Sequence, residues 1–340
     1  MGRGVAITVK NLKKIFSIKK SFSFRDIFSN ECSKITVLDD ISFSVDKGNF
    51  VGLIGLNGAG KSTTLKCLSG LLKPDGGDID VCGFSPYERS NDFLRRISLV
   101  MGGKSQLWWE LPAMETFLLN MEIYGIEKRV FEKRVNEMVD VLDLGKVVED
   151  IPVRKLSLGE RMKCEFVASL LHLPEVVFLD ESTIGLDLVS QERLREFLKR
   201  YVARYGATVV VTSHNMDDVV DLCSKVLVLD DGKLIFNGLI DDLVSRYVSE
   251  KSVSFEFVDC VKRSSVERLL KGCGRVVRFE GRVVEVLVKR ALVASVISKV
   301  LKEFVVEDID VQESSLREVI RGMGDGVVAK LGSESSKNRF

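Results

Sequence analysis

Residues 50–65 read FVGLIGLNGAGKSTTL. The apolar run 50–55 predicts a short buried strand, and the residues from Ser62 onward predict a helix. Between them, residues 55–62 match the pattern G-x-x-x-x-G-K-[ST], in which the backbone N–H groups of a glycine-rich loop surround a phosphate at the positive end of a helix. The predicted phosphate-binding residues are Gly55, Leu56, Asn57, Gly58, Ala59, Gly60, Lys61, Ser62 and Thr63.

The end of this loop and two carboxylates are expected to form one site. Lys61 brings a positive charge to the outer phosphates, and the hydroxyl of Ser62 can bind Mg²⁺. A second apolar run, VVFLD at 176–180, ends on Asp180 and is followed by Glu181. Ligands of open α/β sheets bind at the carboxyl ends of the strands, so we expect Asp180 to hold the metal and its waters and Glu181 to face a water. Without the phosphate loop, these carboxylates would be interpreted as solvated or helix-capping groups.

From Ala6 to about Arg246, short β-branched runs alternate with helical stretches, which predicts an α/β fold with a mainly parallel sheet. Further buried strands are expected at 97–101 and 208–213. Partly alternating apolar residues predict an antiparallel layer formed by segments 6–12, 35–40 and 41–48. Apolar residues at helical spacing predict a helical insert at about 104–173.

After Arg246 the pattern starts again as a small β-α-β-β-α-β unit, the split ferredoxin-like arrangement. Its strands are expected at 252–258, 275–279, 283–288 and 305–312, and its helices at 263–271 and 290–302. We therefore predict a first domain at 1–247, a second at 248–322 and a flexible polar tail at 323–340.

Composition excludes several classes of protein. The chain has 340 residues, with 50 Lys+Arg, 49 Asp+Glu and a net charge of +1. This balance argues against a dedicated polyanion binder, so no nucleic-acid partner is expected. No apolar run approaches the ~18–20 residues of a membrane span, and the N-terminus has no apolar block typical of a signal peptide. These features predict a cytoplasmic chain.

A series of motifs adds to this interpretation. In chain order they are the phosphate loop, LSLGE at 156–160, VVFLDE at 176–181, GLD at 185–187 and His214 after the run 208–213. Alone, Ser157 would be only a helix cap with Glu160 in the first turn. In this order, over about residues 5–246, the motifs resemble the nucleotide-binding subunits of ATP-binding cassette (ABC) transporters. The runs SQLWWELP at 105–112 and STIGLD at 182–187 are similar to an exporter-associated, ABC-2-like branch.

The resemblance implies a P-loop NTPase fold of the ABC ATPase type, with a RecA-like core, an antiparallel β layer and a helical insert, followed by the ferredoxin-like domain. It also implies an ATPase whose cofactors are ATP and Mg²⁺. Glu181 would be the general base, His214 would contact the γ-phosphate, and Phe16 would stack on the adenine.

The resemblance further implies partners. In that family two ATPase subunits close head to tail, so Ser157, Gly159 and Glu160 of one copy would face the nucleotide of the other. We expect a second ATPase subunit, identical or a paralogue, and a separate multi-span transmembrane permease. The chain would then lie on the cytoplasmic face of the cell membrane, held there by the permease.

The sequence departs from the family pattern at three places. The family has a glutamine in a loop where this chain has Gly102 and Gly103. Gln106 could replace that glutamine at the metal only if the loop bends back. Ser182 stands where the family usually has proline, and Glu160 stands where it often has glutamine.

Four further residues or segments carry weaker expectations. Neighbouring side chains point apart in regular structure, so one of Trp108 and Trp109 is expected to anchor local packing. The other could dock a membrane subunit, unless local folding buries both. His172 is expected to be structural. The basic stretch 19–34 is expected to be an exposed loop, either solvated or facing lipid headgroups or a partner.

Two other functions fit parts of the pattern. One is a soluble nucleotide switch whose C-terminal domain senses a metabolite or binds a protein. The other is an ATPase acting on ribosomes or DNA, which calls for tandem cassettes, a long coiled coil or a basic surface. The single phosphate loop and the balanced charge argue against the second alternative.

Overall fold

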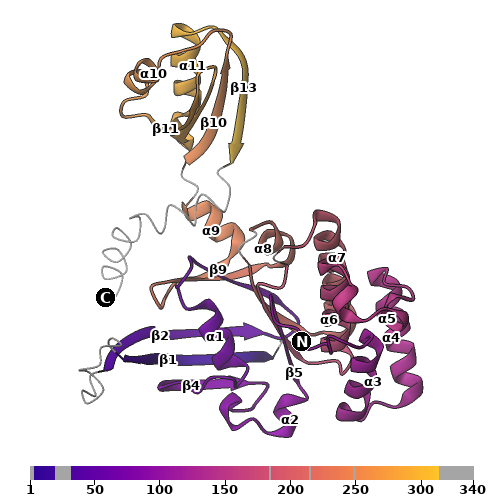
Figure 1. The fold of residues 1–340 in the computed structure, drawn as a ribbon. Helices are drawn as coiled ribbons and strands as arrows, with labels where there is room; N and C mark the ends of the chain where they lie inside the picture. Colours follow the sequence, from indigo (N-terminus) through magenta and orange to yellow (C-terminus); the bar gives the residue numbers. More distant parts are fainter. Residues whose placement is uncertain (1–3, 20–31, 184, 214–215, 248–249, 314–340) are drawn as a thin grey trace, which may run out of the picture. The chain divides into compact units, whose positions relative to one another are not determined.

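The computed structural model describes residues 4–19, 32–183, 185–213, 216–247 and 250–313 (Figure 1). The chain divides into two compact units, Met1–Gly238 and Leu239–Phe340. The domain boundary predicted at residues 247 and 248 falls within the second unit and stays a prediction. The tail predicted at 323–340 lies outside the described residues.

The first unit is built around a mainly parallel sheet. In the described part of the chain, six strands pair in the order β5-β6-β7-β3-β8-β9, and every pair from β5 to β8 is parallel. The strands are β3 (Phe50–Ile54), β5 (Ile97–Met101), β6 (Val176–Asp180), β7 (Thr208–Thr212), β8 (Lys225–Asp230) and β9 (Lys233–Leu239). The α/β prediction is therefore confirmed, and β8 and β9 extend the sheet beyond the strands that were predicted.

A second layer is antiparallel, in the order β2-β1-β4. Its strands are β1 (Val5–Lys19), β2 (Cys32–Asp46) and β4 (Gly76–Val81). Two separate strands were expected at 35–40 and 41–48, but β2 runs through both. The register of β1 shifts near Asn11, whose side-chain amide donates to Asp40 Oδ1 at 2.6 Å, and such a bulge keeps strands paired where the alternation breaks. The loop expected at 19–34 begins and ends within these strands, and its remaining residues are outside the described part.

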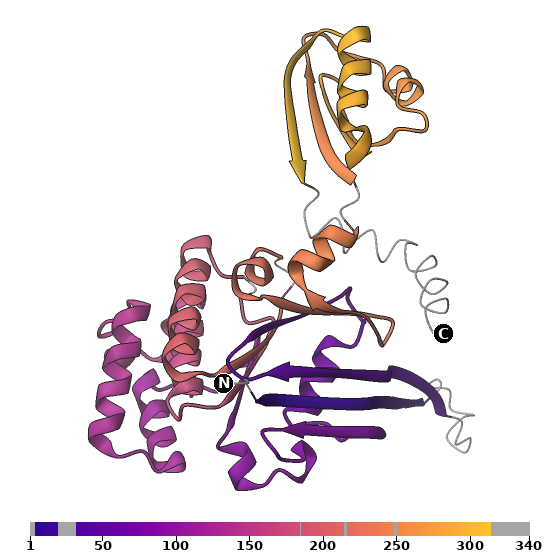
Figure 2. The same cartoon turned by 180° about the vertical axis from the view of Figure 1, so that it is seen from behind.

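The helical insert predicted at about 104–173 is present as helices α3 to α6. In Figure 2 the magenta helices α3, α4 and α5 lie on the side of this unit opposite the indigo strands β1 and β2. The helices are α1 (Lys61–Leu68), α2 (Asn91–Leu94), α3 (Ala113–Tyr124), α4 (Lys128–Leu142), α5 (Val147–Asp150), α6 (Leu158–Leu170), α7 (Leu188–Tyr205) and α8 (Met216–Leu222), with short 3-10 turns η2 (Pro86–Glu88) and η3 (Val153–Lys155). Helix α6 is buried from Met162 to Leu170 and packs against β5, α3 and α4, which joins the insert to the sheet.

The second unit has the predicted β-α-β-β-α-β order, preceded by one helix. Its elements are α9 (Ile240–Tyr247), β10 (Glu250–Phe257), α10 (Arg263–Leu269), β11 (Gly274–Glu280), β12 (Val283–Lys289), η4 (Arg290–Leu292), α11 (Val293–Glu303) and β13 (Val306–Glu313). The described strands pair antiparallel in the order β11-β12-β10-β13, which confirms the ferredoxin-like fold. Phe255 and Val286 of the sheet pack in one core with Val266 of α10 and Val300 of α11.

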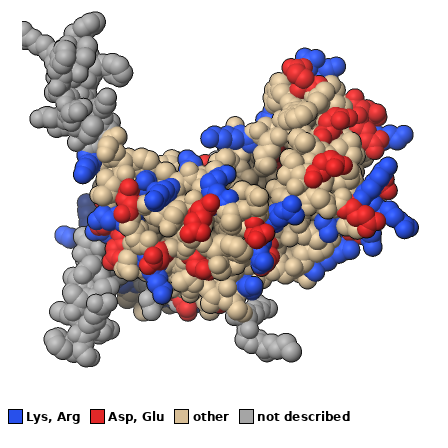
Figure 3. Space-filling view, turned by 90° about the horizontal axis from the view of Figure 1, so that it is seen from below, with Lys and Arg blue, Asp and Glu red and all other residues tan. Residues whose placement is uncertain are grey.

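The surface charge is mixed. On the face shown in Figure 3, basic and acidic side chains are interspersed, in keeping with 50 Lys+Arg against 49 Asp+Glu. No helix in the described ranges has both the length and the apolar character needed to cross a membrane.

Candidate nucleotide and catalytic site

The predicted phosphate loop connects β3 to α1. Gly55 and Gly60 have φ angles of 153° and 102°, which residues with a side chain rarely adopt. A Cβ at Gly55 would lie 2.2 Å from the carbonyl oxygen of Leu229, and a Cβ at Gly60 would lie 2.5 Å from Leu38 Cδ2. The tight path of the loop therefore requires glycine at both positions.

Lys61 lies inside this loop. Its side chain is only 5% exposed, and Nζ donates to the carbonyl oxygens of Gly55 at 2.8 Å and Leu56 at 3.0 Å. Burial lowers the pKa of Lys61, while the carboxylates of Glu181 and Asp180 oppose that change. The ammonium group is therefore held where the loop curves around it, the position from which a lysine reaches the outer phosphates of a nucleotide.

Ser62 and Asp180 meet as the sequence analysis predicted. The Ser62 hydroxyl donates to Asp180 Oδ1 at 3.0 Å, and the buried Thr212 hydroxyl donates to the same oxygen at 2.7 Å. Asp180 and Thr212 meet because β6 and β7 run parallel and end at the same edge of the sheet. A hydroxyl and a carboxylate oxygen are ligands that suit Mg²⁺. Among the described residues there is no group of three or more His, Cys, Asp or Glu that could hold a metal ion.

Glu181 follows Asp180 in an unusual backbone conformation. Its φ is 53°, in the left-handed region, and its N–H donates to Thr212 at the carbonyl oxygen (3.0 Å) and the hydroxyl (3.1 Å). Glu181 also lines a cavity of about 490 Å³ together with Lys104 and Gly185, which has room for water. Strained backbone held in place in this way is common at functional sites.

Gly102 explains part of the departure from the family pattern. Its N–H donates to the carbonyl oxygen of Asp180 at 2.7 Å, and a Cβ there would lie 2.3 Å from the carbonyl oxygen of Glu181. The end of β5 can therefore pack this closely on Asp180 and Glu181 only with glycine at position 102.

The structure does not bring the Gln106 side chain to Ser62 and Asp180, the predicted metal ligands. Its side-chain amide donates to the carbonyl oxygen of Leu99 and to Ser169 Oγ, both at 3.1 Å. Its backbone N–H donates to Glu165 Oε1 at 2.8 Å. The loop does not bend back as a metal ligand would require, because α6 holds it from the other side. The expectation for Gln106 is corrected on this point.

Glu165 was missed in the sequence analysis. This carboxylate on α6 is 2% exposed, and its Oε1 accepts hydrogen bonds from Ser105 Oγ and from the N–H groups of Gln106 (2.8 Å) and Leu107 (3.4 Å). Burial raises the pKa of Glu165, and these hydrogen bonds oppose the rise. The available signal was an acidic residue inside the apolar stretch CEFVASLL at 164–171, where an unpaired charge would be costly.

Truncating Glu165 is expected to destabilise the loop. Glu165→Ala removes the shared acceptor and should lower the free energy of unfolding by about 1–3 kcal/mol, because buried donors lose their partner. Glu165→Gln keeps an acceptor oxygen and should lose less. Urea unfolding of both variants measures the difference, and equal losses would contradict the assigned hydrogen bonds.

The same pair of chains tests the pKa direction. Because the pKa of Glu165 is raised in the folded state, ionisation of this carboxyl opposes folding. The protonated carboxyl therefore contributes its full stabilisation below pH 4.5, the ordinary pKa of the group, and this stabilisation is lost as the pH rises through the raised pKa. Glutamine does not ionise. The unfolding free energy of the wild type minus that of Glu165→Gln should therefore fall as the pH rises above 4.5. A difference that does not change with pH would contradict the raised pKa.

Ser157, Gly159 and Glu160 lie at the start of α6. Ser157 Oγ accepts from the Glu160 N–H at 3.2 Å, and Glu160 Oε2 accepts from the Ser157 N–H at 2.9 Å, which forms a capping box. The Ser157 hydroxyl also donates to Glu160 Oε2 at 2.7 Å, and this hydrogen bond, together with the one from the Ser157 N–H, lowers the pKa of Glu160. Ser157 is exposed, and Leu158 is 38% exposed, so this helix start faces outward. The local cap accounts for Glu160, while a role toward another copy stays a prediction.

Phe16 is 38% exposed on β1, with Lys14 Nζ 5.5 Å from its ring centroid. Stacking of Phe16 on adenine stays a prediction. His214 lies outside the described residues. His172 Nε2 is 3.0 Å from the carbonyl oxygen of Ile97. The ring of His172 stacks on Tyr124 with centroids 4.0 Å apart, and burial lowers its pKa to about 4, as expected of a neutral structural histidine.

Trp108 and Trp109 are both about half exposed, at 51% and 49%. The expectation that one of them would be a packing anchor was wrong, because Leu107 occupies the buried position of this loop. The Arg161 guanidinium lies 5.2 Å from the Trp109 ring centroid. Both indoles therefore contribute to an exposed aromatic surface.

Known proteins are similar to this chain in sequence and fold. Residues 38–184 match the family described as "ABC transporter", and residues 249–312 match "EvrA-like ABC transporter, C-terminal domain". The linearmycin resistance ATP-binding protein LnrL of Bacillus subtilis (strain 168) is 34% identical over 213 residues, which are 63% of this chain and 68% of that protein. The chain belongs to the ABC transporter ATP-binding proteins.

Other relatives agree with this assignment. The bacitracin transport ATP-binding protein BcrA of Bacillus licheniformis is 30% identical over 222 residues, which are 65% of this chain and 70% of BcrA. A solved structure titled "Structure of ATP binding subunit of ABC transporter" is 26% identical with a TM-score of 0.60, covering 71% of this chain and 93% of that one. The chain is an ATP-binding ATPase subunit of this family.

Proposed function

We propose that this ABC subunit hydrolyses ATP at a site completed by a second ATPase subunit and thereby powers a separate multi-span permease. The observation that carries the proposal is the meeting of Lys61, Ser62 and Asp180 at one sheet edge, directly beside Glu181. This set matches the groups that phosphoryl transfer requires.

Each residue has one part in the proposed chemistry. Lys61 and the loop N–H groups bind the β- and γ-phosphates, while Ser62 and Asp180 hold Mg²⁺. When bound, Mg²⁺ would offset the negative charge that develops on the phosphate oxygens. Glu181 orients a water toward the γ-phosphorus and accepts its proton, so the water oxygen bonds to phosphorus as ADP leaves. Contact of His214 with the γ-phosphate rests on the family resemblance.

A second copy would supply the start of its helix α6 to the nucleotide bound by the first copy. The start of α6 is exposed, and a helix N-terminus carries partial positive charge that attracts phosphate. Head-to-tail closure would place Ser157, Gly159 and Glu160 of one copy against the γ-phosphate bound by Lys61 of the other. Hydrolysis removes that phosphate and would reopen the pair.

The exposed surface of Trp108, Trp109 and Leu111 supports docking to a membrane subunit. Leu111 is 37% exposed beside the two half-exposed indoles. Exposed aromatic and aliphatic groups of this kind are typical of a protein interface. The chain would then be peripheral on the cytoplasmic face of the membrane. The name of LnrL, a linearmycin resistance protein, supports an exporter as the system that this chain serves.

Co-purification tests the proposed partner. The tagged full-length chain, extracted from membranes with mild detergent, should carry with it a chain that has several apolar spans. The double variant Trp108→Ala/Trp109→Ala should recover about tenfold less of that partner. Tyr87→Ala, which removes another exposed aromatic ring from η2, is the matched control and should recover it fully. An active ATPase that brings down no multi-span chain would favour the soluble switch.

A further inference from the structure

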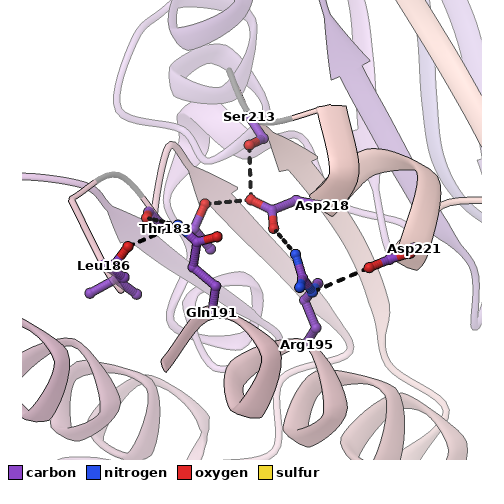
Figure 4. A network of polar contacts seen from close by, with 7 residues as sticks. All are labelled: Thr183, Leu186, Gln191, Arg195, Ser213, Asp218 and Asp221. Atoms are coloured by element: carbon purple, nitrogen blue, oxygen red, sulfur yellow. Dashed lines mark hydrogen bonds and ion pairs between the residues drawn. The ribbon is translucent and has the colours of Figure 1, made fainter. Parts of the chain in front are cut away.

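A buried carboxylate outside the phosphate loop joins the segments that follow β6 and β7. Asp218 on α8 is 1% exposed (Figure 4). Its Oδ2 accepts hydrogen bonds from Thr183 Oγ1 at 2.6 Å and from Ser213 Oγ at 3.1 Å. Thr183 lies two residues after Glu181, and Ser213 follows Thr212 directly. One carboxylate oxygen thus connects the ends of two neighbouring strands.

The charge of Asp218 is compensated from α7. Arg195 Nη1 donates to Asp218 Oδ1 at 2.8 Å, and Arg195 Nε lies 3.4 Å from Asp221 Oδ2. The Arg195 side chain is 16% exposed, so this ion pair is largely excluded from water. A buried carboxylate with an arginine and two hydroxyl partners is held in one geometry, because losing any partner leaves a buried polar group unsatisfied.

A second contact joins the same strand ends on the side of the nucleotide site. The Thr212 hydroxyl donates to Asp180 Oδ1 at 2.7 Å, and the Glu181 N–H donates to the Thr212 carbonyl oxygen at 3.0 Å. The backbone of the left-handed Glu181 is therefore held at two points. Its own N–H is bonded to Thr212, and Thr183, two residues further along, is bonded to Asp218. Beyond it, Gln191 Nε2 on α7 donates to the carbonyl oxygen of Leu186 at 3.0 Å and fixes the next turn (Figure 4).

We propose that Asp218 is a positioning residue for ATP hydrolysis: through Thr183 and Ser213 it sets the backbone at Glu181 relative to the end of β7. The proposal goes beyond the proposed function and rests on the role of Glu181 as the base. Misplacement of a reacting group by about 1 Å can cost about 100-fold in rate. The network acts on the orientation of Glu181 and leaves the nucleotide-binding loop untouched.

Thr183 offers the most selective variants. Thr183→Val replaces the hydroxyl with a methyl group of similar size, and Thr183→Ser keeps the hydroxyl. With the purified full-length chain, Thr183→Val should lower kcat for ATP about tenfold or more, with KM unchanged and the chain still folded at the assay temperature. Thr183→Ser should keep kcat within about twofold of the wild type.

Thr208→Val is the matched control. Thr208 lies at the opposite end of β7, is 1% exposed and accepts from the Gly48 N–H at 3.0 Å. This variant also removes a buried threonine hydroxyl, yet kcat should stay unchanged. Asp218→Asn should resemble Thr183→Val in kcat, and the double variant should be no worse than the more affected single variant, since both break one connection.

Two outcomes would overturn the positioning role. One is a Thr183→Val chain with wild-type kcat. The other is equal kcat losses in Thr183→Val and Thr183→Ser accompanied by lower melting temperatures, which would reduce the network to stability. Glu181→Gln, assayed alongside, separates this proposal from its basis. If Glu181→Gln hydrolyses ATP normally, the assignment of the base fails; if it is inactive while Thr183→Val is normal, only the role of Asp218 fails.

Discussion

The Glu181→Gln chain is expected to bind ATP with unchanged affinity and to hydrolyse it at least about 100-fold more slowly, the contribution typical of a general base. Glutamine preserves the size of the side chain but cannot accept the proton of the attacking water. The phosphate loop, Ser62 and Asp180 are untouched by this change. Phosphate release at saturating ATP and the Kd of a fluorescent ATP analogue measure the two quantities separately.

Glu175→Gln is the control for this variant. Glu175 directly precedes β6, at the other end of the strand, where it pairs with Arg96 at 2.7 Å on the surface. The Glu175→Gln chain should hydrolyse ATP at the wild-type rate. Normal hydrolysis by Glu181→Gln would show that another group activates the water.

Lys61→Ala is expected to lose both binding and turnover. The ammonium group is the one full positive charge that the phosphate loop itself carries. Its loss removes charge-assisted contacts to phosphate worth about 1.5–3 kcal/mol, so ATP affinity should fall roughly 10- to 100-fold and hydrolysis should become undetectable. Isothermal titration with ATP and Mg²⁺ measures the loss of affinity.

Because Lys61 is buried, the melting temperature of Lys61→Ala must be measured alongside. Lys66→Ala is the matched control, since Lys66 lies in the last turn of the same helix, α1. It should bind ATP normally. If a folded Lys61→Ala chain binds ATP with wild-type affinity, residues 55–62 are not the loop that binds the nucleotide.

Most of the fold could be predicted because its strands are short apolar runs bounded by turns. The runs predicted as strands at 50–55, 97–101 and 176–180 all became buried parallel strands, the first of them ending at Ile54. The error at β2 has a local cause. The left-handed residue Asp40 interrupts the alternation of apolar residues, and only the pairing with β1 keeps the strand continuous.

The candidate site was predictable where function depends on residues close in sequence. The phosphate loop is one such stretch, and Asp180 reached Ser62 because parallel strands end at the same edge. Glu165 and Asp218 could not be found in this way. Their importance depends on partners that lie far away along the chain: Thr183 is 35 residues from Asp218, and Ser105 is 60 residues from Glu165. Gln106 was misplaced for the same reason, since Glu165 holds its loop.

We expect one chain to bind ATP but to need the Ser157–Gly159 turn of a second subunit to hydrolyse it. Sedimentation equilibrium of the Glu181→Gln chain with saturating ATP and Mg²⁺ tests this claim most directly, because the nucleotide stays intact between the two copies. We expect twice the mass of one chain with ATP and the mass of a single chain without it. Adding Ser157→Arg should keep the mass at that of a single chain even with ATP. A mass of one chain with ATP bound, or a dimer unaffected by Ser157→Arg, would contradict it.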